Sequence, residues 1–299
     1  MKRITFFAFL LASLIVGCSG SDNDEPTSQP DRGVKTRMLT ITEEATRATL
    51  DESTGELTAL WTAGDGLAYC NLSTLSIQQT QQLSPASGPL TATTSDAISL
   101  FTGEVDCGIY DKLAVVYPAK GFSWYGEKAK YTIPLSGQNG TLSTLATNFH
   151  YVYGVATVNS VTDNTANATM PKMKSLLTVC KFSFKDKSNN ATIPVKTLTI
   201  SYAADGTDGN TGTYPQEATV VCETNQSNVH ATGIRSDNQL MVQLSTATDE
   251  VYVALLPTVA QRSFNFTVTN TSGIYSGTAR ATLGEGEFVV ATGLKLTKK

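Results

Sequence analysis

Cys18 is the residue whose surroundings point most clearly to a chemical reaction. Lys2 and Arg3 precede an apolar run over residues 4–16, and Leu14–Cys18 (LIVGC) resembles a bacterial lipobox. Secretory signals have this order of charged and apolar residues. We expect the thiol of Cys18 to take a diacylglycerol, and its amine, freed by cleavage, to take a third acyl chain. Two or more acyl chains anchor a protein stably to a membrane.

The alternative to lipidation is an ordinary secretory signal in which the cysteine has no role. The apolar run is shorter than the roughly 20 residues of a spanning helix, so we expect residues 1–17 to be removed as a signal peptide. Residues 18–33 then form a polar tether that begins near an acidic patch, Asp22–Glu25. Such a patch resembles a signal for surface export in lipoproteins of Gram-negative anaerobes, although it also serves as a simple solvated spacer.

The remaining cysteines are Cys70, Cys107, Cys180 and Cys222. An exported chain meets an oxidising compartment, so Cys70–Cys107 and Cys180–Cys222 are candidate disulfides. The alternative, which we favour, is four buried thiols that act as small apolar side chains. Their spacing fits no zinc signature. We expect no metal ion and no cofactor.

Residue types that support catalysis are sparse and scattered. His150 and His230 lie about 80 residues apart, and neither belongs to a nucleophile or metal motif. The segment Asp205–Asn210 lacks the spacing of a calcium loop and is explained as a turn between strands. No pair of carboxylates stands out as a glycosidase site. The sequence therefore predicts a protein that is not an enzyme.

Charge and composition narrow the classes of partner. The chain has 22 Lys and Arg against 26 Asp and Glu, a net charge of −4. This balance argues against nucleic acid and anionic lipid head groups as partners. Hydrophobic residues make up 40% of the 299 residues, which is enough for packed cores in one large or two ordinary domains.

The elements expected to position these residues are strands. Short segments rich in Val, Ile, Thr, Tyr and Phe alternate with turns of Gly, Asn, Asp, Ser and Pro. In several segments apolar residues occupy every second position, as in Phe264, Phe266 and Val268, which indicates one buried face. We expect an all-β fold. The predicted strands are 37–42, 66–70, 76–83, 112–117, 130–135, 151–158, 175–185, 196–202, 218–223, 239–245, 250–256, 263–269 and 287–296.

The least patterned stretch is Ser160–Lys172, polar and rich in Asn and Thr. We place a domain boundary there, with an N-terminal domain over residues 34–165 and a C-terminal domain over residues 166–299.

Several short motifs follow the lipobox in a set order along the chain. They are Thr46-Arg47-Ala48, Trp61–Leu67 (WTAGDGL), Val115–Pro118 (VVYP), Met173–Leu177 (MKSLL), Leu255–Pro257 (LLP) and the last strand, Phe288–Leu296. This order resembles the fimbrillin family, the FimA/Mfa-like pilin and anchor proteins of type V pili. One departure is Cys180, where many relatives carry a polar residue.

This resemblance implies two tandem transthyretin-like antiparallel β-sandwich domains and a role as a structural, tip or anchor subunit of a pilus. It also implies an exported lipoprotein of the outer membrane, or one incorporated in extracellular fimbriae. A surface protease would cut after an arginine and release the first strand, and a strand from another fimbrial subunit would fill the vacated groove. Added strands restore both ladder hydrogen bonds and core burial.

The resemblance maps onto particular residues. The removable strand would be Arg37–Thr42, with Leu39 and Ile41 buried. Arg47 best matches the cleavage position and Arg37 is the alternative. An uncut Arg47 at the surface is a further alternative, since anchor and tip members can keep the first strand.

The donor strand would be Gly293–Lys299, which alternates Leu294 and Leu296 with Lys and Thr. It is also explained as the last strand of its own sandwich. A rival function is a non-polymerising, glycan-binding surface lipoprotein, for which Trp124-Tyr125 is the candidate aromatic platform. A hydrolase is a second rival, without residues to support it.

Overall fold

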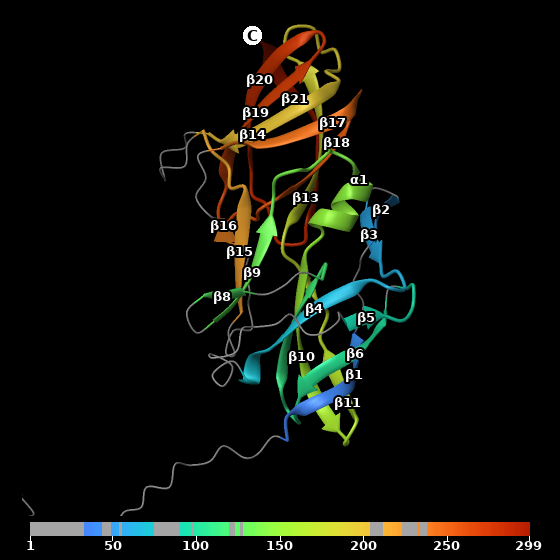
Figure 1. The fold of residues 1–299 in the computed structure, drawn as a ribbon. Coiled ribbons are helices and arrows are strands. Elements are labelled where there is room, and N and C mark those ends of the chain that lie inside the picture. Colours follow the sequence, from blue (N-terminus) through green and yellow to red (C-terminus); the bar gives the residue numbers. More distant parts are fainter. Residues whose placement is uncertain are drawn as a thin grey trace, which may run out of the picture. The chain divides into compact units, whose positions relative to one another are not determined.

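The computed structural model describes residues 33–43, 49–53, 56–74, 90–96, 98–119, 123–125, 128–203, 212–222, 232–233 and 238–299. These residues form strands joined by short loops, and the helical elements among them are brief (Figure 1). They are the 3₁₀ turn Leu72–Thr74, helix α1 (Leu142–Thr144) and the π-helical turn Leu145–Phe149. The predicted all-β fold is confirmed.

The first sheet has eight strands in the order β11-β1-β6-β5-β4-β7-β10-β12. Most neighbours are antiparallel, but β1 and β11 are parallel. The strands are β1 (Lys35–Glu43), β4 (Gly66–Asn71), β5 (Leu90–Ala92), β6 (Leu100–Cys107), β7 (Lys112–Tyr117), β10 (Val152–Val161), β11 (Thr165–Met170) and β12 (Lys174–Ser175).

The second sheet has seven strands in the order β17-β14-β19-β20-β21-β13-β18. It too contains a parallel pair, β13 with β21. The strands are β13 (Thr178–Asp186), β14 (Val195–Tyr202), β17 (Leu240–Thr248), β18 (Val251–Leu255), β19 (Arg262–Asn270), β20 (Gly273–Ala281) and β21 (Phe288–Lys298).

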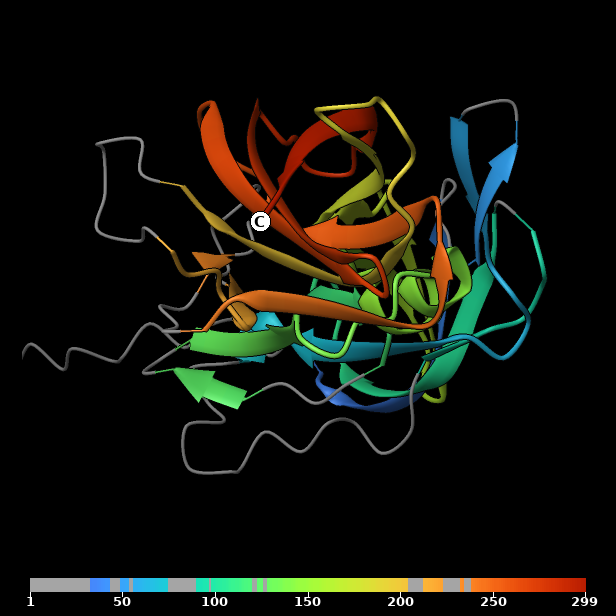
Figure 2. The ribbon, with the colours of Figure 1, turned by 90° about the horizontal axis from the view of Figure 1, so that it is seen from above.

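Two smaller sheets complete the fold. A four-stranded sheet has the order β16-β15-β9-β8, and β2 pairs with β3 in a hairpin. Both views place this hairpin beside α1 and the π-helical turn (Figures 1 and 2). The strands are β2 (Thr49–Ser53), β3 (Glu56–Leu60), β8 (Ser123–Tyr125), β9 (Lys128–Pro134), β15 (Glu217–Cys222) and β16 (Thr232–Gly233).

Buried apolar side chains form two cores. The smaller core gathers Leu39 and Ile41 of β1 around Trp61. The indole of Trp61 meets Phe101 edge-on, with ring centroids 4.7 Å apart, a favourable aromatic arrangement. The larger core contains side chains of the seven-stranded sheet, of β9 and of β15. It also contains side chains from the face of β4 and β7 that does not contribute to the smaller core.

The expected boundary between residues 165 and 166 falls at the start of β11. This strand pairs with β1 and β10, so it belongs to the eight-stranded sheet. Strand β9 pairs along its length with β15, which comes more than eighty residues later in the chain. A cut after β12 would keep the eight-stranded sheet whole, but it would still separate β9 from β15. The division into two domains therefore stays a prediction.

The sequence patterns missed eight of the observed strands, namely β2, β3, β5, β6, β8, β11, β16 and β20. Strand β11 buries Ala166, Ala168 and Met170 on alternate positions, and alanine contributes too little hydropathy contrast to reveal that alternation. In β20, Gly277 lies so close to β21 that a Cβ there would sit 2.8 Å from the Lys295 carbonyl oxygen. Close approach of two backbones favours glycine, and glycine weakens a strand pattern. The predicted strand 76–83 lies outside the described residues.

Candidate functional site: the first strand and its slot

Strand β1 is held on both edges. It pairs antiparallel with β6 from Lys35 to Thr42 and parallel with β11 from Met38 to Glu43. A strand in this position cannot leave without exposing the ladder groups of two neighbours. Its departure would open a slot between β6 and β11, rather than remove an edge.

The inward face of β1 fills this slot with aliphatic side chains. Leu39 and Ile41, the side chains expected to face the core, have no exposed surface. Ile41 lies opposite Phe101 of β6 and Ala168 of β11. Burying a Leu or Ile side chain contributes about 1.5–3 kcal/mol. The outward face carries Met38, a residue that is 47% exposed.

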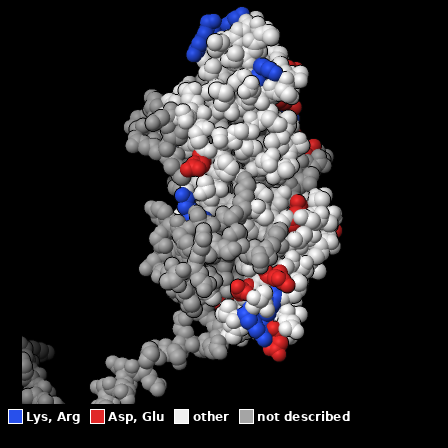
Figure 3. All heavy atoms as spheres, in the orientation of Figure 1, with Lys and Arg blue, Asp and Glu red and all other residues white. Residues whose placement is uncertain are grey.

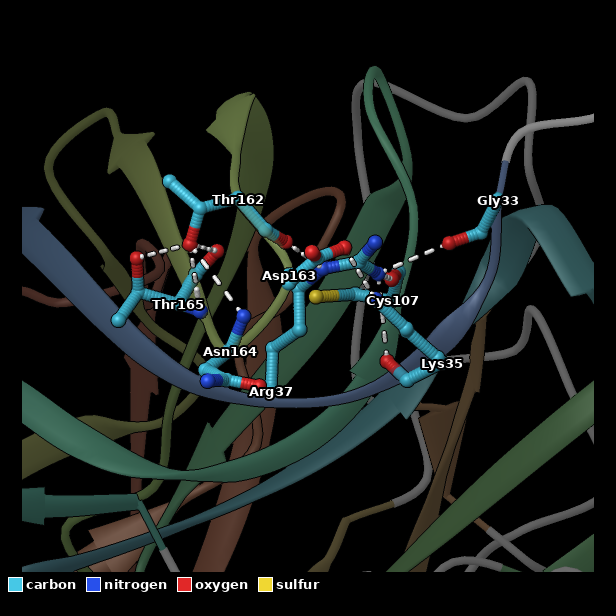
Figure 4. A network of polar contacts seen from close by, with 8 residues as sticks. All are labelled: Gly33, Lys35, Arg37, Cys107, Thr162, Asp163, Asn164 and Thr165. Carbon is cyan, nitrogen blue, oxygen red and sulfur yellow. Dashed lines mark hydrogen bonds and ion pairs between the residues drawn. The ribbon is translucent and has the colours of Figure 1, made fainter.

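Arg37 occupies the same inward face, two positions before Leu39, and is only 5% exposed. Its guanidinium Nε donates to the Thr162 carbonyl at 2.7 Å, and Nη1 donates to the Gly33 carbonyl at 2.9 Å. Nη1 also donates to the carbonyls of Cys107 and, at 3.4 Å, Lys35. Figure 4 shows the guanidinium between the Thr162 carbonyl and Cys107. Buried charges need such partners, because their desolvation is otherwise costly.

The turn that presents the Thr162 carbonyl is itself well ordered. The Thr162 hydroxyl accepts from the backbone N–H of Thr165 at 3.0 Å and of Asn164 at 3.3 Å. The Asn164 carbonyl then accepts from the backbone N–H of Met38 at 3.0 Å. The β10–β11 turn therefore holds both the Arg37 side chain and the backbone of β1.

Acidic side chains surround this end of the slot. The Lys35 ammonium lies 2.6 Å from a carboxylate oxygen of Asp163, and the Thr36 hydroxyl donates to Asp106 at 2.5 Å. The bond from Lys35 and its charge lower the pKa of Asp163, and the charge of Arg37 adds to this effect. Figure 3 shows basic and acidic side chains close together at the end of the molecule where Figure 1 labels β1 and β11.

The predicted processing sites fare differently. Cys18 and Arg47 lie outside the described residues. The peptide bond after Arg37 lies within β1, where both edges of the strand are paired. Proteases bind extended segments that are free of such pairing, so this bond is protected while β1 is in place. Arg47 remains the cleavage position to test.

The hairpin that follows Arg47 in the chain is attached to the seven-stranded sheet. Glu52 of β2 accepts from Lys181 of β13 at 3.2 Å and from the hydroxyl of Tyr252 of β18. Lys181 also lies 3.0 Å from Glu250. The hydrogen bond from Tyr252 is the main cause that lowers the pKa of Glu52. A chain that began at Ala48 would therefore still have its first described strand, β2, fastened through Glu52.

The candidate donor residues lie in β21, within their own sheet. Leu296 is buried and Leu294 is half-buried, and β21 runs parallel to β13. Donation of this segment to another subunit would require its release from β13 and β20.

The four described cysteines carry free thiols and are buried. Burial raises the pKa of Cys70 and Cys222 to about 12 and of Cys107 to about 11. It also raises the pKa of Cys180. Cys70 and Cys107 belong to different cores. At neutral pH these thiols stay protonated and unreactive.

Other candidates contribute no reactive group. His150 is buried. Among the described residues, no group of three or more His, Cys, Asp or Glu side chains could hold a metal ion, and no helix is long and apolar enough to cross a membrane. His230, Asp205–Asn210 and the side chains of Trp124 and Tyr125 lie outside the described residues.

Sequence reasoning missed the role of Arg37 at the end of the slot and the contacts of Glu52. The alternation of side chains along a strand could have indicated the role of Arg37. Arg37, Leu39 and Ile41 occupy every second position, so their side chains lie on the same face. No sequence signal links Glu52 to Lys181, which lies 129 residues later.

No protein-family model and no curated protein matches this sequence. Among solved structures it is similar to the shaft pilin SpaA of Lactobacillus rhamnosus GG, with 11% identity, 89% of this chain and 98% of that chain covered, and a TM-score of 0.33. It is also similar to candidate cell adhesion proteins of two other species. That of Bacteroides eggerthii has 13% identity, coverage of 87% and 86%, and a TM-score of 0.39. That of Parabacteroides distasonis has 9% identity, coverage of 89% and 94%, and a TM-score of 0.42. These similarities are too weak to assign a function.

Proposed function

We propose that this chain is a surface-exported lipoprotein that acts as a structural, tip or anchor subunit of a fimbria in cell adhesion. Acyl chains on Cys18 tether the precursor to the outer membrane. A surface protease cuts after Arg47, and other fimbrial subunits then assemble with the chain by strand exchange.

The observation that carries this proposal is the placement of β1. A single strand near the start of the described chain supplies Leu39 and Ile41 to the core between two other strands. Cleavage after Arg47 would remove its covalent link to the rest of the fold. Emptying pockets of this kind costs about 2–5 kcal/mol for each large aliphatic side chain. An incoming strand that refills both pockets and both ladders recovers that free energy.

The donor in this proposal is β21, whose Leu294 and Leu296 alternate as Leu39 and Ile41 do in β1. In the structure β21 fills its own sheet, so donation exchanges one strand partner for another. Donation breaks the pairing of β21 in its own sheet and forms similar pairing in another subunit. Its direction therefore depends on which of the two slots binds β21 more tightly.

The test is the amino terminus of the protein recovered from the cell surface. Under the proposal, polymerised material begins at Ala48 and migrates as an SDS-resistant ladder. The variant Arg47→Gln should retain the lipidated start at Cys18 and should not extend as a fibre. Polymerised material that begins at lipidated Cys18 would contradict the role of cleavage, and would leave only the anchor form of the proposal.

A further inference from the structure

One end of the β1 slot is polar, and its hydrogen-bond acceptors have two origins. The carbonyls of Gly33 and Lys35 belong to the same segment as Arg37 and would leave with it. The carbonyls of Cys107 and Thr162 belong to β6 and to the β10–β11 turn, and they stay. The slot therefore retains two acceptors that now face a buried guanidinium.

The charges around this end of the slot favour a positively charged side chain. Departure of β1 removes the two cations Lys35 and Arg37 and leaves Asp106 and Asp163, which now bond to Thr36 and Lys35. A buried carbonyl that loses its hydrogen-bond donor is left with an uncompensated desolvation penalty. An apolar or acidic side chain at this position would leave those acceptors unpaired, whereas Lys or Arg pairs them.

We propose that the Cys107 and Thr162 carbonyls form a cation-specific pocket that sets the register of any strand filling the slot. The inference rests on the proposed function, namely that another strand replaces β1. The occupant is a strand of another subunit that carries Lys or Arg at the Arg37 position and aliphatic side chains at the positions of Leu39 and Ile41. A shift of one residue would turn all three side chains to solvent, because strand side chains alternate in direction.

The experiment uses the mature chain with a site for a specific protease inserted within residues 44–48. After cleavage the fragment that contains β1 stays seated, and a fluorescent label on it reports its dissociation into an excess of unlabelled peptide of residues 33–43. The variants are Arg37→Met, Arg37→Lys and, as the matched control, Lys35→Met. The control also removes one cation, but from a side chain that is 45% exposed.

We expect Arg37→Met to speed dissociation by about 10- to 100-fold, because hydrogen bonds to a buried charged group are among the stronger ones. Lys35→Met should change it by less than about 5-fold, since exposed ion pairs contribute little. Arg37→Lys should restore most of the retention. If the labelled fragment dissociates at equal rates in Arg37→Met and Lys35→Met, the proposal of a cation-specific pocket is wrong.

Failure of the proposed function has a different signature. A cleaved chain whose labelled fragment leaves only when the whole protein unfolds, by circular dichroism, does not exchange its first strand at all. Exchange in a folded chain with no dependence on residue 37 leaves the proposed function intact and rejects the cation pocket.

Discussion

Strands β1 and β21 have similar settings but are held to different degrees. Each has a parallel neighbour on one side and an antiparallel neighbour on the other, and each packs aliphatic side chains against a core. The antiparallel partner of β1 is matched along eight residues, whereas β21 meets β20 only at Lys298 and Thr297. Each strand also has a cation two positions from a buried leucine, which is Arg37 in β1 and Lys298 in β21. Arg37 is buried, whereas Lys298 is exposed.

Under the proposed function, this difference suits the two strands to separate parts in strand exchange. Strand β1 is fixed by two full ladders, two buried aliphatic side chains and a buried guanidinium, so it should stay until cleavage removes its link to the fold. Strand β21 has only a short antiparallel ladder, with β20, so we expect it to be the easier of the two to release. A slot that binds strongly and a donor that leaves readily are what an exchange requires.

The largest expected effect contrasts the buried side chains of the two strands. Leu39→Ala should lower the free energy of unfolding by about 2–5 kcal/mol, because it leaves a cavity in a closed core. Leu294→Ala should lower it by about 1 kcal/mol, because that side chain is half-exposed. Urea denaturation followed by circular dichroism measures both. Equal losses would remove the distinction between the two strands.

The cysteines offer reporters for each strand. Cys107 lies opposite Lys35 of β1, and Cys180 lies opposite Val289 of β21. In the chain cleaved within residues 44–48, release of β1 should make Cys107 react with a maleimide while Cys180 stays protected. Mass spectrometry of the labelled peptides distinguishes the two sites, and the uncleaved chain serves as control.

Labelling of Cys180 at the same rate as Cys107 would show that both sheets open together. That result would argue against a first strand that leaves on its own.

A smaller effect is expected when β21 is offered to the slot as a peptide of residues 292–299. When this peptide runs in the direction opposite to β1, its Lys298, Leu296 and Leu294 take the positions of Arg37, Leu39 and Ile41, respectively. The peptide should therefore displace the labelled β1 fragment from the cleaved chain when it enters antiparallel to β1.

The matched peptide with Lys298→Met should compete about 10-fold less well, because it cannot supply a cation to the carbonyls. Equal competition by both peptides would mean that the aliphatic pockets alone select the donor.

The smallest effect concerns the hairpin after Arg47. The pKa of Glu52 is lowered in the folded protein, first by the hydrogen bond from Tyr252. A carboxyl whose pKa is lower in the folded state than in the unfolded state stabilises the fold at pH values above its unfolded-state pKa. This contribution is lost as the pH falls through its folded-state pKa. Glu52→Gln should therefore reduce stability by about 1 kcal/mol at pH 7. The difference from wild type should shrink as the pH falls from about 4.3 through the lowered folded pKa of Glu52.

Glu250→Gln is the control for Glu52, since the side chain of Glu250 is 51% exposed. Its effect at pH 7 should be smaller. A difference between Glu52→Gln and wild type that persists at pH 3 would show that the charge of Glu52 is not what fastens the hairpin.

The fold could be predicted to the extent that hydropathy alternates. Strands with large inward residues, such as Phe264 and Phe266 of β19, are evident from spacing. Strands that bury alanine, such as β11 with Ala166 and Ala168, are not, because the contrast between inward and outward residues is too small. For this reason the predicted boundary fell on a strand of the eight-stranded sheet.

The candidate site could be predicted only in part. The inward positions of Leu39 and Ile41 follow from their spacing, and the same parity places Arg37 beside them. That Arg37 is buried depends on the carbonyls of Cys107 and Thr162, which lie 70 and 125 residues away in the sequence. No local pattern encodes which backbone groups will meet a given side chain.

By itself the sequence determined the class of the fold, the inward face of the first strand and the candidate lipidation position at Cys18. These follow from local properties, namely the alternation of side chains and a short motif. Cleavage after Arg47 is implied by the family resemblance and stays a prediction. The tertiary structure decided that β1 lies between β6 and β11, that Arg37 ends in a pocket of carbonyls, and that β21 is paired within its own sheet. Strand pairing over long separations follows from how whole faces pack together, which no short segment specifies.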